Sequence, residues 1–304
     1  MCFIRVVTNN TNTPCESSSS SSLEANPQHM TNVFSDLYFY KLFINYTGLF
    51  NLYNTCSLLY KLKKYLNYKI KREYSLIYYK NETFRTMVLE KIFNPQKQLY
   101  LDLSNFDNIT DVSYLGNVYS LNLDFCKKIM DVSALGNVHT LSLIFCTQIS
   151  NVSALGSVHT LYLNGCNNIN DVSALIHVHT LVLHWCTNIL DVSALGNVTN
   201  LSLSGCYQIT DVSALGKVHT LNLSSCYQIT DVSALGKVHT LYLSGCYQIT
   251  DVSALGKVHT LELCDCYRIT DVSALANVNK LDLTGCYYIT NIDTLTNVNY
   301  LILD

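Results

Sequence analysis

The chain has 304 residues and a formal net charge of −3, a balance that by itself points to no class of partner. The charge is unevenly divided, because residues 1–100 carry 12 Lys and Arg against 6 Asp and Glu, whereas residues 101–304 carry 7 against 16. The absence of 18 consecutive apolar residues argues against a membrane span. No secretory signal is recognisable at Met1–Val7, so the 13 cysteines are expected to be reduced thiols in the cytoplasm.

The first hundred residues divide into two unlike segments. Residues 1–30 include an unbroken serine run, Ser17–Ser22, and are expected to be disordered because they cannot bury enough apolar surface to offset the cost of ordering. Residues 31–95 carry Leu, Ile, Phe and Tyr at spacings of three and four, which predicts a small helical domain with helices over about 35–45, 49–66 and 68–93. Pro95 and the change of charge predict a domain boundary there.

Residues 96–304 form a third segment that is built from one repeated unit. Ten copies of 20 residues run without insertion from Leu101 to Tyr300, with the consensus L-x-L-x-x-C-x-x-I-T-D-V-S-A-L-G-x-V-H-T. A fixed period of this kind predicts a solenoid, in which each coil stacks on its neighbours and none folds alone.

The repeat also predicts which residues form the core. The L-x-L segment alternates like a β-strand, so neighbouring coils should add their strands to one parallel sheet. Repeat positions 1, 3, 6, 9, 12, 15 and 18 should point inward; in the fourth copy these are Leu161, Leu163, Cys166, Ile169, Val172, Leu175 and Val178. The expected fold class is an α/β solenoid, an arch of about ten short coils with a parallel concave sheet, preceded by a small helical domain.

Cysteine and histidine recur at fixed positions and so form ladders along the solenoid. Cysteine occupies position 6 in nine copies, for example Cys206, where a thiol can pack as a small apolar group and donate to a turn carbonyl. Histidine occupies position 19 in six copies, and Thr199 and Asn279 stand in the same slot. We favour core packing for the cysteines, and a polar residue at the start of the strand for the histidines, over metal binding. No metal ligand is therefore assigned.

Aspartate and glycine recur on either side of the segment V-S-A-L. Asp or Asn at position 11, such as Asp131, is a good N-cap for a short helical turn, and this interpretation is favoured over a calcium site because the Gly-rich loops of ion-binding solenoids are missing. Gly at position 16, such as Gly136 and Gly216, is expected to supply a tight turn.

Binding residues are expected where the copies differ, because the invariant positions only build the arch. An exposed aromatic patch on a sheet is typical of a protein-binding surface. The predicted partner-binding residues of the concave face are Phe125, Ile144, Phe145, Tyr162, Val182, His184, Trp185, Tyr242 and Glu262. A second set lies at position 7, just beyond the strands: Tyr207, Tyr227, Tyr247, Tyr267 and Tyr287. Two roles are equally open for these tyrosines, binding a partner or simply covering the rim of the core.

No catalytic constellation is recognisable. The sequence has no P-loop, no G-x-S-x-G and no H-E-x-x-H, and its histidines and cysteines recur on most copies instead of forming one distinct site. We therefore expect neither catalytic residues nor a cofactor, and no enzymatic activity.

The segment Val198 to Asp211, V-T-N-L-S-L-S-G-C-Y-Q-I-T-D, resembles the leucine-rich repeat. It is similar to the cysteine-containing class, whose C-x-x-I-T-D signature is common in F-box/leucine-rich-repeat proteins. The resemblance covers residues 99–304. D-V-S-A-L leaves room for only about one 3₁₀ turn, as in the short repeats of internalin-like proteins, which implies a thin convex side and a shallow arch.

Residues 32–75 resemble an F-box, on the pieces Asp36-Leu37, Leu42-Phe43, Asn51-Leu52 and Leu59 to Leu62. The resemblance implies docking of a ubiquitin-ligase linker protein. The implied docking residues are Leu37, Leu42, Phe43, Leu49, Leu52 and Leu59. The order of segments and the Asn/Tyr/Ile/Lys-rich style resemble proteins of giant viruses of amoebae, which implies the host cytoplasm.

Three functions follow as hypotheses. The first is a substrate receptor of a cullin-type (SCF) ubiquitin ligase, which would hold a target protein on the concave face. The second is a stand-alone binding scaffold with the helical segment as its N-terminal cap. The third, nucleic-acid binding through the basic front segment, is disfavoured by the acidic solenoid. A strand that begins again at Leu301 leaves an open sheet edge, which predicts either a weak end-to-end dimer or fraying of residues 291–304.

Overall fold

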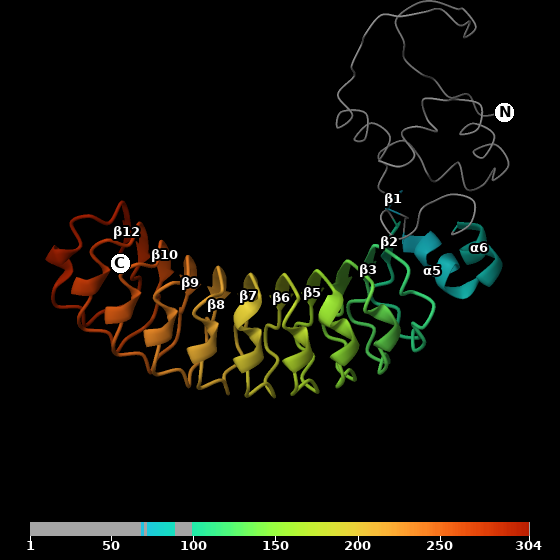
Figure 1. Cartoon of the computed structure of the whole chain (residues 1–304), viewed down its shortest axis with the longest axis horizontal. Coiled ribbons are helices and arrows are strands. Elements are labelled where there is room, and N and C mark those ends of the chain that lie inside the picture. The colour runs from blue at the N-terminus through green and yellow to red at the C-terminus, as the bar shows by residue number, and fades with distance from the viewer. Residues whose placement is uncertain (1–67, 70–71, 89–98, 304) are drawn as a thin grey trace, which may run out of the picture.

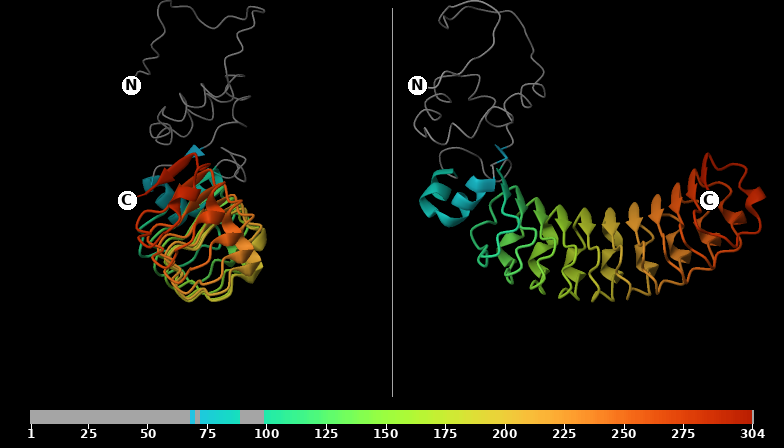
Figure 2. Two further views of the ribbon diagram at one scale, coloured as in Figure 1. Left: turned by 90° about the vertical axis from the view of Figure 1, so that its left-hand side faces the viewer. Right: turned by 180° about the vertical axis from the view of Figure 1, so that it is seen from behind.

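The computed structural model describes residues 68–69, 72–88 and 99–303, and it shows one continuous solenoid (Figure 1). Twelve parallel strands follow one another in sequence order across a single sheet. The views from the front and from behind show a shallow arch with the strands along its inner side (Figure 2). The strands are β1 (Tyr68–Lys69), β2 (Leu99–Asp102), β3 (Ser120–Asn122), β4 (Thr140–Ser142), β5 (Thr160–Tyr162), β6 (Thr180–Val182), β7 (Asn200–Ser202), β8 (Thr220–Asn222), β9 (Thr240–Tyr242), β10 (Thr260–Glu262), β11 (Lys280–Asp282) and β12 (Tyr300–Ile302).

The register of the sheet follows the repeat. Leu121 pairs with Leu141, and Leu141 pairs with Leu161, so equivalent residues of neighbouring coils always lie opposite each other. Each three-residue strand shows the burial pattern partly buried, buried, partly buried for most coils, because alternate side chains of a strand point to opposite faces. The predicted parallel sheet is confirmed.

The core is a column of the seven inward positions, stacked coil upon coil. In the fourth coil, Leu161, Leu163, Cys166, Ile169 and Leu175 are fully buried, and the same positions are buried throughout the column up to the ninth coil except at Phe106. Complete burial of a Leu, Ile or Val side chain contributes about 1.5–3 kcal/mol, so neighbouring coils stabilise one another through this column. The predicted inward set is confirmed.

The side opposite the sheet is thin, as expected from the short repeat. It consists of single 3₁₀ turns: η4 (Ser133–Leu135), η5 (Ser153–Ser157), η6 (Ser173–Leu175), η7 (Ser193–Asn197), η8 (Ser213–Leu215), η9 (Ser233–Leu235), η10 (Ser253–Leu255), η11 (Ser273–Leu275) and η12 (Ile292–Thr294). Asp131 Oδ1 accepts the N–H of Ser133 at 2.8 Å, so the carboxylate satisfies a free backbone donor as predicted. It does so from one residue before the N-cap, Val132.

The prediction for the glycines at position 16 was wrong. Gly136 and Gly216 have φ of −61° and −65°, values that any residue adopts, so no tight turn requires glycine there. Glycine is favoured at this position because the next coil approaches closely. A Cβ on Gly136 would lie 2.3 Å from the carbonyl oxygen of Ala154. Ile176 stands in the same slot in the fourth coil, so a side chain is tolerated at that point of the column.

The N-terminal part of the described chain closes the first coil. Helices α5 (Arg72–Lys80) and α6 (Glu82–Met87) lie at the end of the arch next to β2, and β1 pairs with β2 (Figure 1). Tyr78 and Val88 are fully buried in the same core as the repeats. Arg85 lies over the ring of Tyr114, 3.9 Å from its centroid, and ties the helices to the first coil.

The single helix expected over 68–93 was wrong. Residues 68–69 form a strand, and Asn81 separates the two helices. Asn81 has an extended backbone, and its side chain accepts the N–H of Phe84 at 2.8 Å, so it begins a new helix as an N-cap.

The other expectations for the first segment lie outside the described residues. These are the disordered tail 1–30, the helices over 35–45 and 49–66, and the connection around Pro95. The division into a helical domain over 31–95 and a solenoid over 96–304 stays a prediction, although the sheet already includes β1. Within the described part of the chain, no helix has the length and apolar character needed to cross a membrane.

Candidate functional site

The chain takes a left-handed turn at position 5 of every coil, immediately after the strand. Four of the ten residues there are glycines with φ of 69–75°, and six are not. The turn is held by a hydrogen bond to the next coil, as in Trp185, whose N–H donates to the carbonyl of Ser204 at 2.9 Å. For a residue other than glycine this conformation costs about 1–2 kcal/mol. The six non-glycine residues are Asn105, Phe125, Phe145, Trp185, Ser225 and Asp265.

Three of these six strained positions carry large aromatic side chains. Phe125 is 39% exposed and Trp185 is 54% exposed, and Phe145 is partly buried. The rings of Phe125 and Phe145 stack with centroids 5.2 Å apart. Bulky residues in backbone strain persist only where the surrounding structure enforces them, and such positions cluster at functional sites.

Glycines on the neighbouring coils make room for these rings. A Cβ on Gly165 would lie 2.5 Å from the ring of Phe145, and one on Gly205 would lie 2.3 Å from Cδ1 of Trp185. The aromatic side chain of one coil therefore covers the glycine of the next. We call Phe125, Phe145 and Trp185 the aromatic patch.

The other predicted concave-face residues lie at positions 2 and 4, on or just after the strands. Tyr162 and Val182 are direct neighbours across β5 and β6, and both are partly buried. They extend the apolar surface beside the aromatic patch. The same face holds Ile144, His184, Tyr242 and Glu262, which are also partly buried.

Two polar residues of this face are bonded to serines of the sheet. His184 Nε2 lies 2.6 Å from Ser202 Oγ, and burial holds the pKa of this imidazole below its usual value. Ser244 Oγ donates to Glu262 Oε1 at 2.7 Å. Their assignment to partner binding stays a prediction.

The five predicted rim tyrosines form a row along consecutive coils, and the last four of them are stacked. Ring centroids lie 5.2 Å apart between Tyr227 and Tyr247, 5.4 Å between Tyr247 and Tyr267, and 6.4 Å between Tyr267 and Tyr287, with planes within 7° of parallel. The exposed fraction of the five side chains runs from 39% to 71%. The row is therefore accessible to solvent, and its assignment to partner binding stays a prediction.

The cysteine ladder is structural, as expected. Each thiol is buried and donates to a carbonyl 23 residues earlier, as Cys206 Sγ does to Leu183 at 3.0 Å. Burial raises the pKa of the Cys206 thiol to about 12, so it stays protonated.

The histidine ladder is a stack of parallel rings. His139 and His159 have centroids 4.5 Å apart and planes within 12°, and each Nδ1 lies 3.2–3.3 Å from the hydroxyl of the threonine that follows. Parallel rings do not direct their nitrogens at one ion. In the part of the chain that the structure describes, no group of three His, Cys, Asp or Glu side chains is placed to hold a metal ion.

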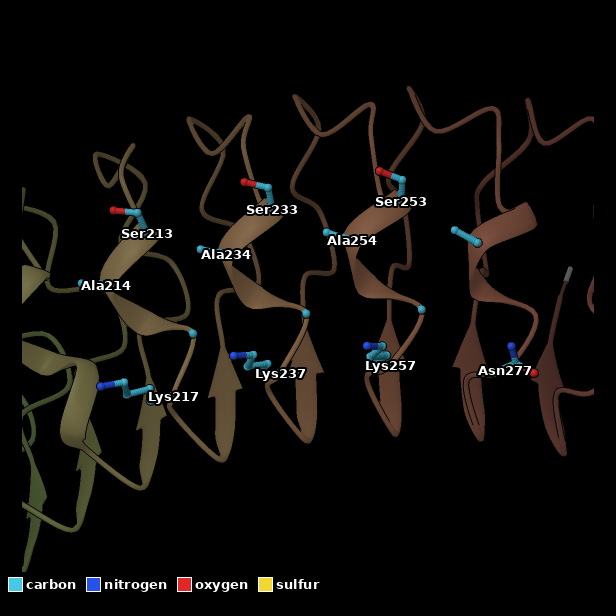
Figure 3. Close-up of a pocket in the computed structure, with 14 residues that line it drawn as sticks. Ser213, Ala214, Lys217, Ser233, Ala234, Lys237, Ser253, Ala254, Lys257 and Asn277 are labelled. Atoms are coloured by element: carbon cyan, nitrogen blue, oxygen red, sulfur yellow. The ribbon is translucent and has the colours of Figure 1, made fainter.

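A shallow hollow of about 800 Å³ lies along the 3₁₀ turns (Figure 3). It is lined by Ser, Ala, Gly and Asn277, and by three lysines from nearly identical coils. Lys217, Lys237 and Lys257 are solvated ammonium groups along an open surface, and the hollow has no strained or unusual residue. It serves below as the control surface.

The expected linker-protein docking residues cannot be placed. Leu37, Leu42, Phe43, Leu49, Leu52 and Leu59 all lie outside the described residues. Sequence reasoning also missed the left-handed turn at position 5, which the glycines at 165, 205, 245 and 285, one in every second coil, could have indicated.

Comparisons with known proteins support the fold. No family model matches the sequence, and no curated protein matches it. Among solved structures, an internalin (inlF) of Listeria monocytogenes is 26% identical with a TM-score of 0.51, over 68% of this chain and 67% of that one. The internalin C2 (inlC2) of the same organism is 24% identical with a TM-score of 0.46, over 57% and 83% of the two chains. The functional domain of its InlJ, described as including a cysteine ladder, is 22% identical with a TM-score of 0.47, over 66% and 51%.

The repeat, the sheet and the likeness to the first of these internalins agree on one architecture. The fold is a leucine-rich-repeat solenoid of short coils, with a parallel sheet on its concave side and 3₁₀ turns on the other.

Proposed function

We propose that this chain is a protein-binding scaffold without enzymatic activity, which holds a protein partner on the aromatic patch and the neighbouring sheet face. The observation that carries this proposal is the backbone strain at Phe125, Phe145 and Trp185. Glycine would meet the backbone requirement of position 5 without cost, yet three coils carry rings there, two of them substantially exposed. Large exposed aromatic side chains are typical anchors of protein interfaces.

The test is affinity capture from a cell lysate with the full chain as bait, followed by quantitative mass spectrometry. A partner should be retained by the wild type and lost by Trp185→Ala. Leu190→Ala is the matched control, because Leu190 is 60% exposed but lies outside the patch. Retention that is equal for all three baits would contradict the proposal.

A narrower proposal is that the chain is the substrate receptor of an SCF-type ubiquitin ligase. It rests on the resemblance of residues 32–75 to an F-box. Purified ligase linker protein should bind the full chain, and Leu52→Asp should abolish this binding while leaving capture through Trp185 intact. Absence of binding to the linker protein would remove the ubiquitin role and leave the scaffold.

The alternative is a stand-alone scaffold with a helical cap. The packing of α5 and α6 favours it for residues 72–88, because Tyr78 and Val88 complete the core of the first coil. The F-box resemblance covers residues 32–75 and so falls mainly before Tyr68, whereas the packing that favours a cap is that of residues 72–88. The linker-protein experiment distinguishes them.

The cytoplasm is the compartment we propose, which is the host cytoplasm if the source is a virus. The thiols support this, because no disulfide joins the ten cysteines of the described residues. A weak end-to-end dimer through β12 also stays a prediction. Sedimentation velocity over a range of concentrations tests it, and a monomer at every concentration would exclude it.

A further inference from the structure

Positions 5 and 7 of the repeat share one space at the rim of the sheet. The hydroxyl of Tyr247 lies 3.6 Å from where a Cβ on Gly245 would be. The hydroxyl of Tyr267 hydrogen-bonds to the side chain of Asp265. A tyrosine at position 7 therefore folds back over position 5 of its own coil.

The sequence of each coil reflects this shared space. The coils with an aromatic residue at position 5 carry Lys127, Thr147 and Thr187 at position 7. The coils with tyrosine at position 7 carry Gly205, Ser225, Gly245, Asp265 and Gly285 at position 5. Eight of the coils thus give one aromatic side chain each to the same rim, and the fourth, with Gly165 and Asn167, gives none because Phe145 already covers its glycine.

The result is one aromatic strip that follows the edge of the arch where the strands end. Its second half is the row of five tyrosines. With about 200 Å² per ring and the measured exposed fractions, these side chains leave on the order of 450 Å² open to solvent. A standard interface buries about 800 Å² on each partner, so the row is large enough to be the centre of one.

The spacing of the tyrosines selects the shape of the partner. Centroids along the regular part of the row are 5.2 and 5.4 Å apart. One turn of an α-helix advances about 5.4 Å, so a helix laid along the rim places one side chain per turn against each ring and stays in register. Side chains on one face of an extended strand repeat at about 6.6 Å, and they fall out of register within a few residues.

The charge of the rim selects the chemistry of the partner. The residues that follow the first three tyrosines are Gln208, Gln228 and Gln248, all exposed and uncharged. Arg268 follows the fourth tyrosine and donates to Gln248, and its charge is matched by that of Asp265 at position 5 of the same coil. A rim with no net charge gives no net attraction to a polyanion or a polycation.

We propose that the row of tyrosines is a docking strip for an amphipathic α-helix of a partner protein, neutral on its docking face and about four turns long. The proposal goes beyond the proposed function, because it adds a second surface, the row of tyrosines along the rim, to the aromatic patch and its neighbouring sheet face. The helix presents an apolar stripe with a period of three to four residues.

Two synthetic peptides of 18 residues and zero net charge test this proposal with the full chain. Both contain the same Leu, Ala, Gln and Ser residues; one spaces the leucines by three and four residues, and the other alternates them. Binding is measured by fluorescence anisotropy and helix formation by circular dichroism. The first peptide should bind and become helical, and the second should not.

Substitutions in the row identify the docking surface. The triple variant Tyr227→Ser, Tyr247→Ser, Tyr267→Ser should weaken binding of the first peptide at least tenfold, whereas the corresponding triple Phe variant keeps the rings and should bind normally. Tyr288→Ser is the matched control, because Tyr288 is 66% exposed and lies one residue outside the row. Circular dichroism of the Ser variant without peptide shows whether a loss of binding reflects unfolding.

Several outcomes would overturn the inference. These are equal binding of both peptides, no binding of either, or undiminished binding to the triple Ser variant. Peptide binding that depends on Lys217, Lys237 and Lys257 would also overturn it. If neither peptide binds while Trp185→Ala still abolishes partner capture, the helix inference is wrong and the proposed scaffold function is retained.

Discussion

The ring of Trp185 lies over Gly205 so closely that a Cβ on the glycine would be 2.3 Å from Cδ1 of the indole. The same relation joins Phe145 to Gly165 and Asp265 to Gly285. In this part of the solenoid, position 5 is therefore a ladder in which a larger residue alternates with a glycine. The scaffold positions build the coil, and this alternation decides which side chains at position 5 reach the surface that we propose binds a partner.

Gly205→Ala should displace the indole of Trp185. The added methyl group overpacks the contact, and together with the left-handed backbone it should destabilise the fold by about 1–3 kcal/mol. Trp185 is the single tryptophan of the chain, so its fluorescence reports the displacement directly. The emission should shift to longer wavelength as the ring enters solvent.

Gly245→Ala is the control for that experiment. Gly245 has nearly the same backbone, φ 71°, but its added Cβ would have no neighbour closer than 3.6 Å. It should lower the free energy of unfolding by about 1 kcal/mol and leave the emission unchanged. An identical spectrum for both variants would mean that Trp185 does not rest on Gly205.

Ser225→Gly should stabilise the protein by about 1 kcal/mol, because it relieves the left-handed strain at φ 60° and removes only a small, partly buried side chain. Urea unfolding of the variant and the wild type measures this. A less stable variant would show that the hydroxyl of Ser225 contributes more than the strain costs.

The buried thiols should make the fold sensitive to alkaline pH. Burial raises the pKa of Cys206 from 9.0 to about 12, so the folded state keeps a proton that the unfolded state releases. The stabilisation is complete below pH 9 and is lost as the pH rises toward 12, by about 1.4 kcal/mol per pH unit for one thiol.

Comparison with Cys206→Ala isolates this effect. The variant should be less stable at pH 7, because it loses the hydrogen bond to Leu183, but its unfolding free energy should fall less steeply between pH 9 and 10.5. Tyrosine and lysine ionisation is common to both proteins and cancels in the difference. Equal slopes would refute the role of the thiol.

The aspartates of the turns should give the opposite dependence. The pKa of Asp231 is lowered because its carboxylate accepts hydrogen bonds from Ser233. Its contribution is present above pH 3.8 and is lost as the pH falls through the lowered folded pKa. Asp231→Asn should keep the turn, as Asn151 does with Ser153, and lose less stability between pH 5 and pH 2. Unfolding curves that respond to acid as in the wild type would contradict this.

The repeat predicted the arch because its signal is repeated ten times. The spacing of Leu161, Leu163 and Cys166 predicts a strand and an inward thiol from the residues of one coil alone. The role of Gly136 could not be predicted in this way, because the carbonyl oxygen that leaves no room for a Cβ belongs to Ala154 of the next coil, 18 residues further on. A pattern within one coil does not show a contact between coils.

The candidate site shows the same limit. Phe125, Phe145 and Trp185 were predicted from their apolar character alone, but their left-handed backbone became evident only in three dimensions. The break at Asn81 was missed because the apolar periodicity continues across it, and only the capping bond to Phe84 reveals two helices. Sequence periodicity indicates which face is apolar, not where the backbone is interrupted.

The most direct test of the scaffold places a photo-reactive phenylalanine analogue at Trp185 in the full chain and, in a second protein, at Lys237 in the hollow of the 3₁₀ turns. Both are irradiated in the same lysate, and the cross-linked products are identified by mass spectrometry. Our account predicts one discrete protein adduct from position 185 and none from position 237. Adducts of the same proteins from both positions, or a discrete adduct from position 237 alone, would contradict binding at the aromatic patch.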